Sequence, residues 1–411
     1  MKELLLFIEQ SQLIEILRYL SIPLISGLVG WGTNVMAVKM TFYPLEYIGL
    51  PPFGWQGIIP SKARKMAEKS VDLLTIKLIK IDEQFALLDP HRVAEEIHEP
   101  LQELSRKILN EVMDAQIPKV WRNTPDTVKN VMYDKVAEDL PTVVEEMMKD
   151  MSTHIKELLN LKTMAVGTLM QDKTLVNQIF WKCGKDEFKF IEKSGIYFGS
   201  LFGIIQMMIW YFYSPWWLLP LFGLLVGYAT NWIALYWIFR PLNPVKIGPF
   251  TIHGLFFKRQ DEVSKEYSQI VTDKILTTRN MFDTIVHGPG SEKLTEIVGG
   301  HIEKIINVMA GSSGKTVIDW LAGPRQLEII KNIACFRFMQ ELPLTLRSTY
   351  DYVEEALNMR GMLQEKMAGL SYEEFEGFLR PAFQEDELTL IIVGAILGCM
   401  AGFTQYFLLF Y

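Results

Sequence analysis

Two threonine-asparagine pairs set in apolar sequence, Thr33-Asn34 and Thr230-Asn231, are the residues best suited to bind something. A helix that crosses a bilayer has no water to satisfy its polar side chains, so a polar pair at that depth either packs against protein or holds a ligand. As packing residues, the asparagine amides would hydrogen-bond a neighbouring helix. As binding residues, the two asparagines would face each other and coordinate an ion or a headgroup. The sequence favours packing and leaves binding open.

Both pairs belong to a segment that occurs twice. GWGTNVMAVKMTFYPL, residues 30–45, returns 197 positions later as GYATNWIALYWIFRPL, residues 227–242. A second pattern returns 199 positions later, because Gly195, Gly199, Gly203 and Gln206 recur as Gly394, Gly398, Gly402 and Gln405. The number of copies of a repeat decides the architecture. We therefore predict a tandem duplication whose unit opens with the Thr-Asn segment and closes with the Gly-Gln segment.

The Gly-Gln pattern is more typical of packing than of chemistry. Glycines four residues apart form a flat stripe on one face of a helix, which lets a second helix approach closely. Gln206 and Gln405 would then hydrogen-bond across the contact. We expect both glutamines to hold helices together.

Basic residues mark the ends of the apolar stretches. Arg240 precedes Pro241 at the end of one stretch, where a guanidinium can reach the membrane surface and bind a lipid phosphate. The corresponding residue of the first copy is Tyr43, so the two copies differ there. Lys258 and Arg259 follow an apolar loop, which suits anionic headgroups, although the solvated start of a helix is an equally good interpretation.

No pattern of catalytic residues points to an enzyme. The sequence has no HExxH zinc motif, no GxSxG nucleophile elbow and no CxxC pair. Three scattered cysteines are too few for a disulfide framework or a thiolate metal site, in keeping with a reducing compartment. Acidic residues outnumber basic ones by 24 to 21 in residues 45–193 and by 21 to 16 in residues 241–387, which argues against nucleic acid as a partner. We predict no enzyme, no cofactor and no metal.

Long charge-free stretches predict four transmembrane helices. Residues 194–239 run for 46 positions without Asp, Glu, Lys or Arg, which is enough for two spans of about 20 residues each. Ser214-Pro215, among aromatic residues, marks the turn between them. Residues 19–38 and 388–411 supply the other two spans. Four spans place both large polar regions on one side of the membrane, and the excess of Lys and Arg beside the spans makes that side the cytoplasm.

The predicted organisation follows from these boundaries. In chain order it comprises an N-terminal amphipathic segment with the first span (1–44), a helical cytoplasmic region (45–193), a hairpin of two spans (194–240), a second helical cytoplasmic region (241–387) and a fourth span (388–411).

The two polar regions have the spacing of amphipathic helices, as in Leu101, Leu104 and Ile108. We expect prolines to divide these helices into pieces at Pro90, Pro100, Pro118, Pro125 and Pro141. The segments 44–60 and 243–254 are turn-rich and suit a loop or a small hairpin. Methionines gather in the first region at Met113, Met132, Met147, Met148, Met151, Met164 and Met170. Such a stripe more often fills a core than lines an adaptable groove for lipid or a partner helix.

Three segments carry a resemblance to a known family. The GxxTNxxAxxxxFxPL core, the run GLFFKRQ at 254–260 and the run RPAFQEDE at 380–387 resemble the bacterial membrane family known as domain of unknown function 445, which is similar to the YheB and YjiN proteins. The resemblance covers essentially the whole chain. It implies a multi-pass protein of the cell inner membrane and implies no particular activity.

The sequence thus predicts an all-α membrane protein with four transmembrane helices from a tandem duplication and two helical cytoplasmic regions. The first function we expect is a non-enzymatic membrane scaffold or lipid-handling protein, with membrane lipids as its partners. The alternative is a small transporter or channel whose path is lined by the Thr-Asn pairs. Four spans make a narrow bundle, so a pore of that kind would need a homo-oligomer.

Overall fold

A computed structural model describes residues 2–50, 54–313, 318–384 and 387–409. The side chains of residues 247, 250, 378, 379 and 409 lie outside this description, as do those of three groups, residues 2–15, 308–327 and 381–384. The predicted amphipathic character of the N-terminal segment depends on the first of these groups. The family-like run at 380–387 falls largely in the last group and in residues 385–386, which are likewise outside the described part of the chain.

The chain forms two compact units, each built from separate stretches of sequence. Unit 1 contains Met1–Leu73, Leu169–Ile270 and Gln364–Tyr411, and unit 2 contains Leu74–Thr168 and Val271–Leu363. Three helices run from one unit into the other: α9 (Leu161–Gln171), α14 (Gln260–Lys274) and α19 (Met359–Ala368). Each predicted polar region therefore contributes its ends to unit 1 and its middle to unit 2.

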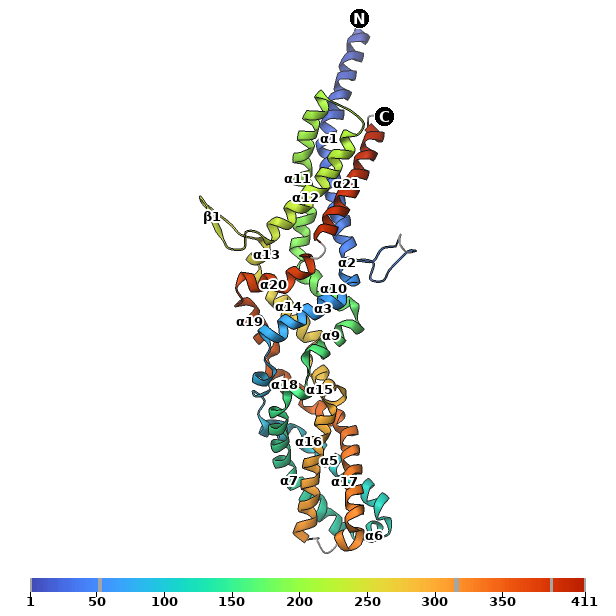
Figure 1. The fold of residues 1–411 in the computed structure, drawn as a ribbon, viewed down its shortest axis with the longest axis vertical. Helices are drawn as coiled ribbons and strands as arrows, with labels where there is room; N and C mark the ends of the chain where they lie inside the picture. Colours follow the sequence, from blue (N-terminus) through green and yellow to red (C-terminus); the bar gives the residue numbers. More distant parts are fainter. Residues whose placement is uncertain (1, 51–53, 314–317, 385–386, 410–411) are drawn as a thin grey trace. The chain divides into compact units, whose positions relative to one another are not determined.

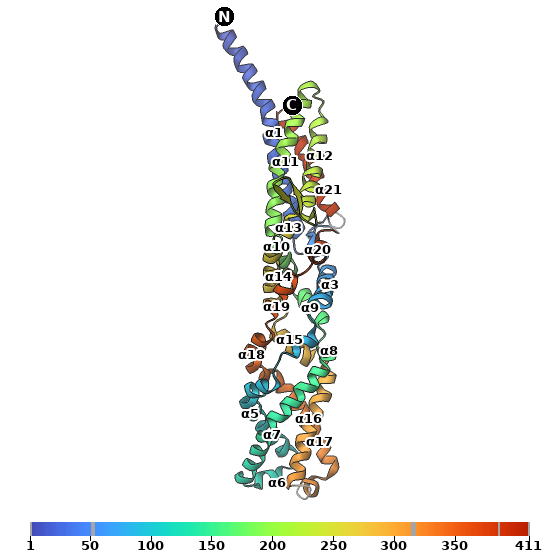
Figure 2. The ribbon, with the colours of Figure 1, turned by 90° about the vertical axis from the view of Figure 1, so that its left-hand side faces the viewer.

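Unit 1 is dominated by four long helices that lie side by side in both views (Figures 1 and 2). These are α1 (Lys2–Phe42), α11 (Lys185–Phe212), α12 (Leu218–Phe239) and α21 (Glu387–Leu409). The segments Ile16–Phe42, Lys185–Phe212, Leu218–Phe239 and Glu387–Leu408 are long and apolar enough to cross a membrane. The prediction of four apolar, membrane-crossing helices in an all-α protein is thereby confirmed. The sides that their ends face remain a prediction.

Shorter elements complete unit 1. They are α2 (Ile58–Ser61), α3 (Ala63–Leu73), α10 (Lys173–Cys183), α13 (Leu255–Lys258), α20 (Tyr372–Gln384) and the strands β1 (Val245–Ile247) and β2 (Phe250–Ile252). The two strands pair antiparallel, with Val245 opposite Ile252, and a single bridge joins Ile48 to Trp55 in the first copy of the repeat. The turn-rich segments therefore form a small hairpin after the second copy and a bridged loop after the first.

The regular elements of unit 2 are all helices in the part of the unit that the structure describes. It contains the π-helix η1 (Leu74–Leu78), α4 (Ile81–Phe85), α5 (Pro90–Gln116), α6 (Pro118–Asn123), α7 (Asp126–Thr153), α8 (Ile155–Leu158), α15 (Thr278–His287), α16 (Ser291–Ser313), α17 (Ile318–Thr345), the 3₁₀ helix η2 (Leu346–Thr349) and α18 (Tyr350–Leu357). The apolar stripe predicted on α5 is buried against α7 and α17, with Val136 and Leu140 from α7 and Ile330 from α17. Burial of that stripe holds the unit together.

The prolines of unit 2 do not all divide helices, which corrects the prediction. Pro90 and Pro118 each occupy the first turn of a helix, where the missing N–H costs nothing. Pro125 is the N-cap of α7. Pro100 and Pro141, in contrast, lie inside continuous helices. Buried apolar side chains on either side of each, such as Ile97 and Leu101, offset the lost hydrogen bond and keep the helix intact.

Candidate functional site

The glycine stripes bring the membrane-crossing helices into backbone contact. A Cβ atom added to Gly199 of α11 would lie 2.6 Å from the carbonyl oxygen of Ser26 on α1, and one added to Gly203 would lie 2.7 Å from the Cα of Pro23. Gly195 meets the backbone of Gly30 in the same way. Only glycine allows helices to approach this closely.

The second copy repeats this arrangement between α12 and α21. Gly394 meets the backbone of Gly227, Gly398 meets that of Gly223, and Gly402 meets Leu219 and Pro220. At the middle glycine of the stripe the second copy is closer, because an added Cβ at Gly398 would lie 2.1 Å from Gly223 O, against 2.6 Å between Gly199 and Ser26 O. Gly223 stands where the first copy has Ser26. Each pair of helices is therefore closed by a dry contact between backbones.

The predicted asparagines both lie in these contacts and both donate to a carbonyl of the paired helix. Asn34 Nδ2 donates to Ile191 O at 2.7 Å, and Asn231 Nδ2 donates to Leu390 O at 3.1 Å. Both side chains are completely buried. The amide oxygen of each has no hydrogen-bond partner among the described residues. The NH2 group of each asparagine thus packs against the paired helix, whereas the amide oxygen accepts no hydrogen bond from the described residues.

The predicted threonines and glutamines differ between the two copies. Thr33 donates to Gly30 O within its own helix at 3.0 Å, whereas the Thr230 hydroxyl is buried without a partner in the described part of the chain. Gln206 Oε1 accepts a hydrogen bond from Ser26 Oγ at 2.9 Å. Gln405 is also buried, but its Nε2 has no partner among the residues described.

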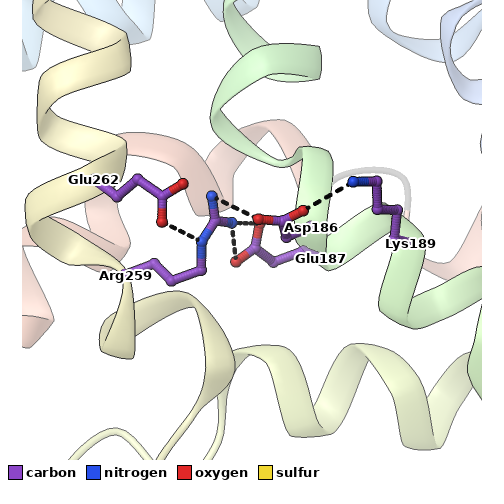
Figure 3. Close-up of polar contacts among 5 residues, drawn as sticks. All are labelled: Asp186, Glu187, Lys189, Arg259 and Glu262. Carbon is purple, nitrogen blue, oxygen red and sulfur yellow. Dashed lines mark hydrogen bonds and ion pairs between the residues drawn. The ribbon is translucent and has the colours of Figure 1, made fainter.

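Arg259 sits among carboxylates instead of facing the solvent (Figure 3). Its Nη1 lies 2.8 Å from Glu187 Oε2, its Nη2 lies 3.1 Å from Asp186 Oδ2, and its Nε lies 2.9 Å from Glu262 Oε2. The Arg259 side chain is 20% exposed and that of Glu187 is 4% exposed. Lys189 reaches Asp186 at 3.3 Å. The guanidinium therefore ties the start of α14 to the start of α11.

This environment shifts the titration of the cluster. The hydrogen bond that Arg259 donates to Glu262 and the charge of Glu187 raise the pKa of Arg259, against the opposing effect of burial. The same guanidinium lowers the pKa of Glu262. Arg259 is therefore permanently charged and committed to protein carboxylates. The geometry does not support its predicted role in binding headgroups, because its charge is already matched and mostly covered.

Arg240 is also held by an acidic residue. Its Nη1 lies 3.2 Å from Glu376 Oε1, and Glu376 makes a second ion pair with Arg380. Burial, and then the charge of Arg240, lower the pKa of Arg380. Arg380 also stacks over the ring of Phe239, 5.8 Å from its centroid. Lys258, in contrast, is exposed. Of the three predicted basic residues, Lys258 is exposed, Arg240 is one-third exposed and Arg259 is mostly buried.

Unit 2 contains an apolar cavity of about 80 Å³. Methionines line it from α7, together with apolar residues from α5, α15, α16 and α17. The lining residues include Val143, Val144, Met147, Met148, Met151, Phe282, Ile302, Ile305, Phe338 and Leu342. Thr345 is the one polar residue of the lining, and its hydroxyl donates to Glu341 O. No unsatisfied polar group of the lining therefore calls for water, and the cavity suits an apolar occupant.

Three of the seven methionines singled out in the sequence, Met147, Met148 and Met151, line this cavity. The cavity walls from α15, α16 and α17 could not be recognised from the sequence, because they come from segments about 150 residues further along the chain. His301, which is buried on α16, was likewise missed. A lone histidine in an apolar helix gives no signal until its partners on another helix are known.

Four helices able to cross a bilayer in an all-α fold define the class, and the chain is a helical membrane protein. No family model matches the chain, and no solved structure matches it.

The chain is similar to several curated UPF0754 membrane proteins. One from Lysinibacillus sphaericus is 29% identical over 141 residues, which cover 33% of this chain and 32% of the relative. One from Anoxybacillus flavithermus is 29% identical over 103 residues, 24% of this chain and 26% of the relative. One from Bacillus licheniformis is 40% identical over 63 residues, 14% of this chain and 16% of the relative. The chain thus spans about a third or less of these relatives, whose name states a membrane location and no activity.

Proposed function

We propose that this chain is a non-enzymatic, lipid-handling membrane protein, in which unit 1 is the membrane anchor and unit 2 receives an apolar chain. The observation that carries the proposal is the methionine-lined cavity of unit 2. A cavity of this kind, outside the four membrane-crossing helices, offers an alkyl chain an environment similar to the bilayer interior. We expect fatty acyl chains of membrane lipids as the occupants.

The size and lining of the cavity fit part of such a chain. At about 80 Å³ it is smaller than the cavity of about 150 Å³ that takes up benzene in another protein. It therefore receives the end of an alkyl chain and not a whole lipid. Methionine side chains are unbranched and adapt their shape to an occupant. Met147, Met148 and Met151 are thus suited to make room for further carbons.

The close backbone contacts in unit 1 support a role as a membrane anchor more than a role as a path for a solute. Backbone meets backbone between α1 and α11 and between α12 and α21, so neither helix pair leaves space for a solute. One observation favours the alternative of a small transporter or channel. Among the described residues, the amide oxygens of Asn34 and Asn231 and the hydroxyl of Thr230 have no hydrogen-bond partner. Flux of ions in proteoliposomes that disappears in the Asn34→Ala/Asn231→Ala double variant would establish that alternative.

We further infer that the chain arose by tandem duplication and that both polar regions face the cytoplasm. A bacterial inner membrane is the location implied by the resemblance to the family of domain of unknown function 445. Matching contacts support the duplication. Gln56 Nε2 donates to Leu45 O, and His253 Nε2 lies 3.0 Å from Leu242 O, with each residue displaced by 197 positions. The Asn34 and Asn231 contacts described above match in the same way.

A photoactivatable fatty acid tests the proposal directly. The full chain is reconstituted in lipid nanodiscs with a diazirine-bearing fatty acid, irradiated, and the crosslinked residues are mapped by mass spectrometry. Crosslinks should fall on the lining of the unit 2 cavity, with Met147 and Ile302 among them. Val144→Phe, which fills the cavity, should reduce them severalfold, and Leu140→Ala, which enlarges it, should increase them.

Val128→Phe provides the matched control, because it places the same residue on the exposed face of α7. Circular dichroism of all variants verifies that the helices are intact. Crosslinks confined to unit 1, or crosslinks in unit 2 that Val144→Phe leaves unchanged, would refute the proposed function.

A further inference from the structure

Two arginines share one glutamate beside the end of a membrane-crossing helix. Arg240 directly follows α12, and Arg380 lies on α20, which precedes α21 in the chain. Both guanidiniums contact the same atom, because Nη1 of each is paired with Oε1 of Glu376, at 3.2 Å in the case of Arg240. The side chains of Arg240, Arg380 and Glu376 are 34%, 22% and 12% exposed. One mostly covered carboxylate therefore serves two cations.

This cluster retains an excess of positive charge, since two positive charges and one negative charge leave one positive charge uncompensated. Burial and the neighbouring Arg240 lower the pKa of Arg380, and the weaker effect of Glu387 opposes them. Glu387 forms no ion pair with either arginine in the described part of the chain. Arg259, by comparison, contacts three carboxylates. The cluster can therefore accept a further anion, whereas Arg259 cannot.

The corresponding positions in the first copy of the repeat are uncharged. They lie 197 positions earlier for the first residue of the cluster and 199 positions earlier for the other two, the offsets of the two repeated patterns. The residues at these positions are Tyr43 in place of Arg240, Asn177 in place of Glu376 and Trp181 in place of Arg380. The two copies therefore differ in charge at three positions that lie together in the structure.

The packing around the end of the span is nevertheless similar in the two copies. The ring of Trp181 packs against that of Phe42, with the centroids 5.0 Å apart, and the guanidinium of Arg380 lies over Phe239, 5.8 Å from its centroid. Asn177 Nδ2 donates to Phe42 O at 2.7 Å. Neutral side chains thus complete this packing in the first copy. The charges of the second copy are not needed to build it, which favours a use in binding.

The position and the donors of the cluster suit the phosphate of a lipid. Phe239 is the last residue of an apolar span, and a basic residue directly after a span can reach the lipid headgroups. Guanidinium groups donate pairs of parallel hydrogen bonds to phosphate oxygens. A lipid whose headgroup carries one net negative charge would neutralise the cluster.

We propose that Arg240 and Arg380 form a binding site for the phosphate of an anionic phospholipid at the end of α12. Glu376 holds the two guanidiniums together and also competes with the phosphate for their N–H groups. The site belongs to the membrane anchor and goes beyond the proposed function, because it does not involve the cavity of unit 2.

Native mass spectrometry of the full chain in detergent, titrated with single lipids, tests the site. Phosphatidylglycerol should bind about tenfold more tightly than phosphatidylcholine, whose choline neutralises the same phosphate. Arg240→Gln and Arg380→Gln should each weaken the binding of phosphatidylglycerol about tenfold, the effect of one charge-assisted contact. Lys193→Gln is the matched control, because it removes an exposed charge beside another span, and should change the affinity by less than about twofold.

Two further variants separate binding from a structural role. Glu376→Gln removes the competing carboxylate and should strengthen the binding of phosphatidylglycerol, whereas a cluster that only stabilises the fold would bind less or not change. The triple variant Arg240→Tyr/Glu376→Asn/Arg380→Trp, which has the residues of the first copy, should keep its helical circular dichroism and bind both lipids equally.

Equal binding of the two lipids by the wild type would overturn the site, as would a Glu376→Gln variant that binds phosphatidylglycerol no better than the wild type. Inorganic phosphate distinguishes a lipid from a free anion. At the same concentration as the lipid it should not displace phosphatidylglycerol, and displacement would overturn the assignment to a phospholipid. These outcomes are independent of the crosslinks in unit 2, so either proposal can fail without the other.

Discussion

Arg259 and Glu187 form a buried ion pair at the start of a membrane-crossing helix, and removal of one member leaves the other without compensation. An unpaired buried carboxylate is far more costly than a lost surface pair. Arg259→Ala should therefore destabilise the protein by about 3 kcal/mol, measured as thermal or denaturant unfolding in detergent. Adding Glu187→Gln should recover part of the loss.

Lys258→Ala is the control at the neighbouring position. Lys258 is exposed, so its loss should change stability by less than about 0.5 kcal/mol. If Arg259→Ala proved as mild as Lys258→Ala, the buried pair would not contribute to stability, and a role of Arg259 at the lipid surface would regain support.

Acid should weaken the same cluster. Arg259 lowers the pKa of Glu262 below its ordinary value of 4.5, so the stabilisation from this contact is present above that value and is lost as the pH falls through the lowered pKa. Because Glu262 is largely exposed, solvent screens the contact, and the effect should be below about 1 kcal/mol. The difference in unfolding free energy between wild type and Glu262→Gln should shrink between about pH 5 and pH 3. A difference that grows on acidification would contradict the assignment.

At the residue scale, the sequence predicted which side chains matter better than what they contact. Asn34 and Asn231 were recognised because a polar residue in an apolar helix needs a partner, whichever helix supplies it. The ion pair between Arg259 and Glu187 could not be predicted, because Glu187 lies 72 residues earlier in the chain. Sequence spacing contains no information about such a pairing until the helices have been placed.

Among the elements, the glycine stripes are the feature most open to test. Gly199→Ala would place a methyl group against the backbone of Ser26, which cannot move aside. We expect a loss of about 1–3 kcal/mol from overpacking, seen as a lower unfolding temperature in detergent. Gly32→Ala, on α1 but with nothing within 4 Å of the added Cβ, should be neutral or stabilising by up to about 1 kcal/mol. Equal effects of the two changes would show that the close contact is not formed.

The helices themselves were predictable because hydrophobic periodicity and charge-free length are local properties. The exceptions have a physical cause. Pro100 and Pro141 were expected to end helices from their local chemistry, yet burial of the flanking residues outweighs the lost hydrogen bond. The cavity of unit 2 could not be predicted from the sequence for a similar reason, because its walls come from five or more helices in two distant stretches of the chain.

For the whole molecule, the decisive prediction concerns the sides of the membrane. Lys119 and Arg337 belong to the two polar regions and Tyr213 to the turn between α11 and α12. Replaced singly by cysteine in a chain lacking its three native cysteines, Lys119→Cys and Arg337→Cys should react with an impermeant maleimide from the same side, and Tyr213→Cys from the opposite side. Labelling of the first two from opposite sides would contradict both the topology and the duplication.

Removal of the native cysteines should be well tolerated and partly unnecessary. Cys183 is buried, and burial raises the pKa of its thiol, so little reactive thiolate forms near neutral pH.

The division into two units could not be predicted from the sequence. Each unit combines stretches that lie far apart in the chain, whereas sequence boundaries followed the change from apolar to polar composition.

The order of the paired helices also has a consequence for synthesis. Asn231 donates to the carbonyl of Leu390, which lies 159 residues later in the chain. Asn34 likewise donates to the carbonyl of Ile191, a residue that is synthesised after it. At about 5–20 residues per second, a ribosome completes α12 roughly 10–30 s before the helix that covers it. During that interval the helix that is made first, α1 or α12, lies in the bilayer while the partner of its asparagine and glycine face is missing. Its insertion therefore depends on other molecules that cover this face until the partner helix is made.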